Sequence, residues 1–94
     1  MHSPFSVTLW HLRSGVRCFV KFIPAAIRED GSGNVRVEYS FRHPDGLPLD
    51  LEKLAVQVQT WTKSLMRHEF GLPQGWRYDN PKHEKRLHKN MFLL

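Results

Sequence analysis

The chain has 94 residues, and 14 Lys and Arg against nine Asp and Glu give it a formal net charge of +5. This length allows one hydrophobic core but not two, so we expect a single domain spanning residues 1–94. A hydrophobic fraction of 40% with 24% charged residues argues against a wholly disordered chain. Cys18 is the only cysteine, which excludes an intramolecular disulfide and a thiolate metal cluster.

Two strands are predicted near the start of the chain. Apolar residues alternate with other residues across 5–13 and again across 16–23, which is the period of two that a strand produces. The short interruption at Ser14-Gly15 predicts that the two strands form a hairpin. Pro24 is expected to end the second strand or to place it at an edge, because proline cannot donate to a ladder.

A polar turn across 28–34 and a third strand across 35–42 are predicted next. Val35, Val37, Tyr39 and Phe41 alternate with Arg36, Glu38, Ser40 and Arg42, which indicates a sheet with one face in water. On that face, Arg17 and Lys21 of the second strand could extend a cationic surface, although ordinary polar alternation explains the same pattern. Phe19 shares this face of the second strand, where an exposed ring would supply a platform for base stacking, but we expect the ring to be buried.

A long helix is predicted from Leu51 to Phe70, with Asp50 as its N-cap and Gly71 as its stop. Its apolar residues recur every three or four positions and form a stripe that can cover the sheet: Leu51, Leu54, Ala55, Val58, Trp61, Thr62 and Leu65. The stretch 72–80 has neither a helical nor a strand period, so it is predicted to be an ordered loop held by its aromatic residues.

The last fourteen residues predict a second helix with two unlike faces. Asp79 or Asn80 can cap it, and Pro81 suits its first position. One face is apolar, with Leu87, Met91 and Leu94, and the other face carries the basic row of Lys82, Lys85, Arg86 and Lys89. Residues 81–94 have a net charge of +3, which leaves +2 for the rest of the chain.

These elements predict an α+β fold in the order β-β-β-α-α. A three-stranded antiparallel meander would pack on the long helix, and the basic helix would dock beside it. The expected core joins the third strand to the helix stripe through Val35, Val37, Tyr39, Phe41, Leu54, Val58, Trp61 and Leu65.

The basic row is the main functional signal of the sequence. Four cations on one helix face could contact successive phosphates, with a salt slope near −3.6 on duplex DNA at about 0.9 per contact. Arg77, Trp76 and Tyr78 come directly before this helix and could form an exposed recognition element, or the two rings could clamp the loop onto the domain. Alternatively, the basic row is only the solvated outer face of a helix that packs through its apolar side.

No catalytic, metal or cofactor motif is present. His83 and His88 are five positions apart, about 140° round a helix, so they do not readily share one ion. Cys18 sits in an apolar alternation, where a thiol is buried and its pKa is raised. A metal-independent nuclease is the least implausible enzyme, and its candidate residues would be Arg42, His43, His83, Arg86 and His88.

We therefore predict a non-catalytic module that contacts RNA or DNA backbone through the basic row. The alternative is a small accessory or inhibitory protein that binds an acidic protein surface or a larger, possibly ribonucleoprotein, assembly. No apolar run approaches the roughly 20 residues of a membrane span, and no signal peptide is recognisable, so we expect a cytoplasmic protein. A lipid-surface role for the final helix is a further possibility.

Overall fold

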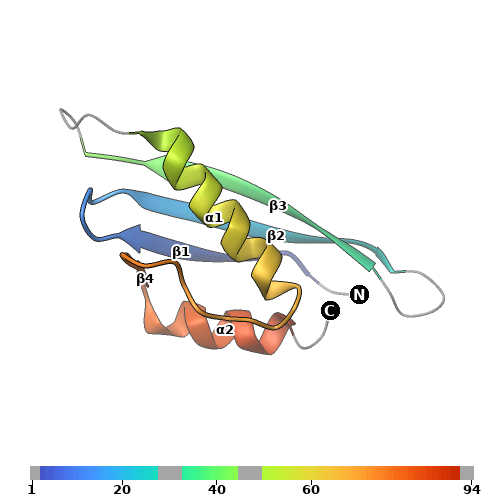
Figure 1. Ribbon diagram of the computed structural model, residues 1–94. Helices are drawn as coiled ribbons and strands as arrows, with labels where there is room; N and C mark the ends of the chain where they lie inside the picture. The colour runs from blue at the N-terminus through green and yellow to red at the C-terminus, as the bar shows by residue number, and fades with distance from the viewer. Residues whose placement is uncertain (1–2, 28–32, 45–49, 92–94) are drawn as a thin grey trace.

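The computed structural model describes residues 3–27, 33–44 and 50–91. It is an α+β fold in which a four-stranded antiparallel sheet of order β3-β2-β1-β4 is combined with two helices (Figure 1). The elements are β1 (Phe5–His11), β2 (Arg17–Ile27), β3 (Gly33–Arg42), α1 (Leu51–Leu65), β4 (Trp76–Tyr78) and α2 (Pro81–Met91). The α+β class is confirmed, whereas the order is β-β-β-α-β-α because a fourth strand lies between the helices.

The predicted hairpin is present. The turn between β1 and β2 is closed by a bond of 2.8 Å from the His11 amide to the Val16 carbonyl, and Gly15 adopts a φ of 77°. A positive φ is the conformation in which glycine has no steric cost, so Gly15 is the residue that permits the tight reversal. The β1 strand therefore ends at His11, two residues earlier than the sequence suggested.

Pro24 does not end β2, which continues to Ile27 with a register shift between Pro24 and Ile27. The pairing of β2 with β1 runs only as far as Phe22. Beyond that point β2 pairs with β3 alone, so Pro24 lies where one side of β2 has no paired strand among the described residues, as the edge alternative predicted, and a residue without an amide proton can be accommodated. The predicted turn across 28–34 lies largely outside the described residues, while Gly33 and Asn34 belong to β3.

The α1 helix begins as predicted, because Asp50 accepts a bond of 3.1 Å from the Lys53 amide. It ends at Leu65 rather than at Phe70. The helix is followed by a turn in which the Ser64 carbonyl accepts from the Glu69 amide at 3.0 Å. Within this turn His68 has a φ of 56°. A left-handed residue after the last turn is the usual way to stop a helix, and here His68 has that conformation instead of Gly71.

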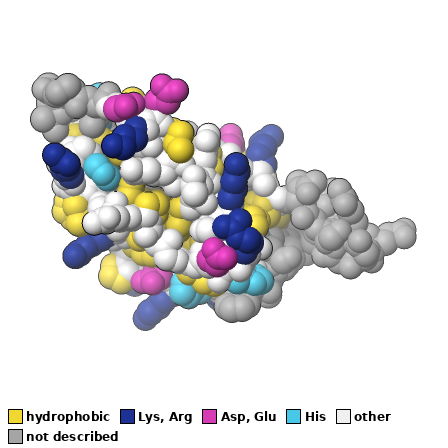
Figure 2. Space-filling model, viewed as in Figure 1, with side chains coloured by type: hydrophobic (Ala, Val, Ile, Leu, Met, Phe, Trp, Pro, Cys, Tyr) yellow, Lys and Arg dark blue, Asp and Glu magenta, His cyan; other side chains and the backbone are white. Residues whose placement is uncertain are grey.

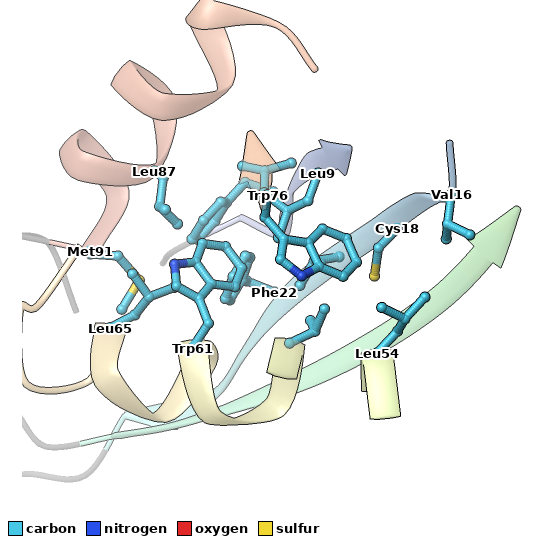
Figure 3. Close-up of a cluster of buried hydrophobic side chains, with 14 residues drawn as sticks. Leu9, Val16, Cys18, Phe22, Leu54, Trp61, Leu65, Trp76, Leu87 and Met91 are labelled. Carbon is cyan, nitrogen blue, oxygen red and sulfur yellow. The ribbon is translucent and has the colours of Figure 1, made fainter. Parts of the chain in front are cut away.

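The core lies between the sheet and the helices. The α1 helix crosses one face of the sheet obliquely, and α2 lies beside β1 and β4 (Figure 1). Trp61 lies at the centre with side chains from both helices and the strands around it (Figure 3). The most deeply buried strand residues come from β1 and β2, whereas the β3 residues predicted for the core, Val35, Val37, Tyr39 and Phe41, are only partly buried.

Candidate nucleic-acid interface

The α2 helix is fixed to the domain through its apolar side. Leu87 and Met91 are 0% and 2% exposed and belong to the cluster that contains Trp61 (Figure 3). The Oδ1 atom of Asn80 accepts from the Lys82 amide at 2.9 Å and so caps the helix start. The predicted division of the two faces is therefore observed, although Leu94 lies outside the described residues.

The basic row lies on the exposed side of α2. Lys82, Lys85, Arg86 and Lys89 are all exposed, and successive members are three, one and three positions apart. At 100° per residue they occupy an arc of about 100° round the helix, opposite Leu87. The burial of the opposite face holds this row outward as an ordered array of cations.

The α2 helix also seals the edge of β1 that β4 is too short to cover. The β4 strand pairs only with residues 9–11 of β1. At Thr8, the amide donates to Nδ1 of His83 at 3.1 Å and the carbonyl accepts from the Asp79 amide at 2.9 Å. Nη1 of Arg86 donates to the Ser6 carbonyl at 3.1 Å. These polar groups of β1 are thus satisfied by two α2 side chains and by the backbone amide of Asp79 instead of a strand.

The β4 strand corrects the prediction of a loop at residues 72–80 and decides which of its side chains are available. Trp76 is 4% exposed and its Nε1 donates to Oε1 of Gln57 at 2.8 Å. Tyr78 packs its ring edge-on against Trp61, with centroids 6.4 Å apart. Both rings hold the segment to the domain, so Trp76 is a core residue rather than a surface contact, and Arg77 between them is exposed.

The environment of Tyr78 also changes its acidity. Burial raises the pKa of the Tyr78 hydroxyl to about 12, and repulsion from Glu84 adds to the effect. The ring is therefore neutral in the physiological range and is a packing element with a polar tip.

The second face of the sheet is not covered by any helix among the described residues, and we call it the open sheet face. Cross-strand pairing places one row of side chains over all four strands: Arg77, Trp10, Arg17 and Arg42. The Arg17 guanidinium lies 4.4 Å from the Trp10 ring centroid, and its Nε is 3.1 Å from Oδ1 of Asp79. Stacking and ion pairing together fix the orientation of this cation.

Phe19 lies on the open sheet face and is 42% exposed, so the prediction that it is buried was wrong. Its cross-strand neighbours are Thr8 on β1 and Ser40 on β3, whose short side chains leave the ring uncovered. The core side of β2 is filled by Cys18, Val20 and Phe22, which leaves the alternate position facing water.

The charge on the open sheet face is predominantly positive. Its described carboxylates are those of Glu38 and Asp79, and they are outnumbered by its described cations, which are Arg17, Lys21, Arg36, Arg42 and Arg77. On the other face, which carries α1, Lys and Arg side chains are scattered among acidic and hydrophobic ones (Figure 2). An anionic ligand would therefore be attracted to the open sheet face more than to the face with α1.

The nuclease candidates are not assembled into one site. Arg42 and His43 are at the end of β3, and β2 and β1 separate them from α2. His83 is engaged with the β1 backbone, and the His88 ring packs on Phe70 with centroids 4.2 Å apart.

The described residues contain neither a cluster of metal ligands nor a reactive thiol. No group of three or more His, Cys, Asp or Glu residues there could hold a metal ion. Cys18 is 0% exposed, and burial raises its pKa to about 12, which leaves the thiol in its unreactive form at neutral pH. The described residues also contain no helix long and apolar enough to cross a membrane.

Comparison with known proteins gives no further guidance to the site. The chain matches no protein-family model, and neither the curated proteins nor the solved structures contain a significant match. The surface chemistry of α2 and of the open sheet face is therefore the basis on which a function is inferred.

Proposed function

We propose that the protein is a binding module that contacts the phosphate backbone of nucleic acid through the basic row of α2. The observation that carries the proposal is the burial of Leu87 and Met91, which holds the row outward. An ordered array of cations loses less conformational entropy on binding than free lysines in a loop. Arg77 lies in the segment directly before α2 and adds a further cation.

Phosphate binding predicts a steep dependence on salt. Each phosphate neutralised contributes about 0.9 to the log-log slope on duplex DNA and about 0.7 on a single strand. Removing three contacts should therefore flatten the slope by about 2.7 on a duplex or about 2.1 on a single strand. We expect wild-type affinity in the micromolar range at low salt, as is typical of contacts without base readout.

The test is a triple variant with Lys82, Lys85 and Lys89 changed to Gln. Arg86 is left in place because it also bonds the Ser6 carbonyl. The matched control changes the exposed residues Lys53, Lys63 and Arg67 to Gln, which removes the same charge from α1 and the turn after it.

Binding is measured by fluorescence anisotropy with labelled RNA and DNA at about 50 and about 200 mM salt. The triple variant should lose most of its affinity and have a salt slope flattened by the amount given above, whereas the control should retain the wild-type affinity and slope. Equal losses of affinity in the two variants would show that net charge controls binding and the position of the basic row does not. No binding by the wild-type protein at low salt would refute the proposal.

A protein partner is the second candidate, and the position of β3 favours it. This strand is outermost in the sheet order, so among the described residues no strand pairs with its outer edge. An extended segment of another protein could add to such an edge through main-chain hydrogen bonds. Binding of that kind would tolerate salt and would survive the triple variant, which separates it from phosphate binding.

A further inference from the structure

We propose that the open sheet face and the basic row of α2 form one continuous surface for a single-stranded polynucleotide, with an unpaired base stacked on Phe19. This inference rests on the proposed function, because it specifies which form of nucleic acid the same protein binds. It adds a site for bases to a site for phosphates.

Arg86 joins the two parts of the surface. Its Nη1 bonds the carbonyl of Ser6, and the Ser6 side chain alternates with buried neighbours on β1 and so lies on the open sheet face. Round the helix, Lys82 and Lys89 follow within about 60° of Arg86 on the side away from the core. A chain of phosphates could therefore pass from α2 to the edge of the sheet without crossing an uncharged gap.

Phe19 provides the stacking platform. Its ring lies in the middle of the sheet and is bordered by the small hydroxyl side chains of Thr8 and Ser40. A shallow hollow of about 370 Å³ adjoins it, with Lys21 and Glu38 among its lining residues. An exposed ring with low neighbours on a flat sheet is the arrangement on which an unpaired base can stack.

The distribution of charge indicates where bases and phosphates would lie. Glu38 borders the hollow beside Phe19, opposite Lys21 and 3.9 Å from the Arg36 guanidinium, and its carboxylate can accept from the amino group of a base. The adjacent row contains Arg77, Arg17 and Arg42, and although Asp79 pairs with Arg17, the row keeps a net positive charge that would attract phosphates. Bases over the hollow and phosphates beside it are compatible with both sets of charges.

A single strand fits this surface better than a duplex or a protein. In a duplex the faces of the bases are stacked on one another and cannot reach a ring in the centre of a sheet. A protein interface usually has a central cluster of apolar side chains. Among the described residues, the other exposed large hydrophobic ones lie in the β1–β2 turn or in α1 and the residue after it, so they form no such cluster on the open sheet face: Leu12, Leu51, Val56 and Met66.

The test compares Phe19→Ala with Phe19→Trp, and uses Val56→Ala as the matched control. Val56 is 55% exposed on α1, so this control removes an exposed apolar side chain from the other face. The probes are labelled oligo(dT), oligo(U) and a mixed-sequence DNA duplex, each of about 12 units, which is within the range of known single-strand sites. Circular dichroism confirms that each variant is folded.

Phe19→Ala should weaken binding of both single strands by about 10-fold, since stacking is worth about 1–3 kcal/mol per base and 1.4 kcal/mol is tenfold. It should leave duplex binding and the salt slope unchanged, because it removes no charge. Phe19→Trp should retain single-strand binding, and Val56→Ala should resemble wild type.

The outcomes separate this inference from the proposed function. Single-strand binding that is unchanged in Phe19→Ala but lost in the triple lysine variant would overturn the stacking site and leave the backbone site intact. Tighter binding of the duplex than of either single strand would also overturn it. No binding of any probe by the wild-type protein would refute the proposed function and this inference together.

Discussion

Replacing Leu87 with Ala tests whether α2 is docked firmly enough to present an ordered basic row. The Leu87 side chain is 0% exposed and lies in the same buried cluster as Trp61 and Leu65 (Figure 3). Truncation removes buried methyl groups and leaves a cavity among large side chains, a change that costs about 2–5 kcal/mol. We expect about 3 kcal/mol of destabilisation, which corresponds to a decrease in Tm of roughly 12–24 °C for a domain of this size.

The measurement is urea unfolding followed by circular dichroism and tryptophan fluorescence. Lys89→Ala is the matched control, because Lys89 is two positions away on the same helix but exposed, and we expect its effect to stay within about 0.5 kcal/mol. A loss below about 1 kcal/mol for Leu87→Ala would show that the helix contributes little to the core. Such a small loss would refute the inference that packing orders the basic row, whatever the binding experiments gave.

Two further predictions concern titratable groups whose pKa the fold shifts. Burial raises the pKa of the Cys18 thiol to about 12, so the thiol should not react with a disulfide reagent in the folded protein at pH 8. It should react fully in urea. Rapid reaction of the folded protein would contradict the structure. Burial, and then the charge of Arg13, lower the pKa of His11 below its usual 6.5, so the unfolded chain binds the proton more readily. The contribution of His11 to the free energy of unfolding should therefore be fully present above pH 6.5 and decrease as the pH falls toward the lowered pKa. His11→Gln should reduce this dependence. Identical pH profiles of stability in the variant and the wild type would contradict the assignment.

Features with a local period in the sequence were predicted well. The hairpin, the third strand, the N-cap at Asp50 and the two faces of α2 each follow from spacing within about ten residues, and the structure contains all of them. The end of α1 was not predictable in the same way. It depends on the turn after Ser64, and the left-handed position falls on His68, a residue with no such signature in the sequence.

The β4 strand was missed because its three residues are too few to show a period. Its existence depends on pairing with β1, more than sixty positions earlier in the chain. The exposure of Phe19 has a similar origin, since β2 has apolar residues on both sides of its alternation and its own sequence does not show which side is covered. The register that places Phe19 between Thr8 and Ser40 decides the question.

Arg86 shows why a charge pattern cannot assign roles within a site. In the sequence it is equivalent to the lysines of the basic row, yet in the fold it bonds the carbonyl of Ser6, 80 positions away, at the edge of the sheet. A guanidinium can satisfy a backbone carbonyl with one nitrogen and still offer its remaining donors to a phosphate. Arg86 can therefore belong to the fold and to the binding surface at once, so its replacement would mix a loss of stability with a loss of binding, whereas the lysines can be changed to report on binding alone.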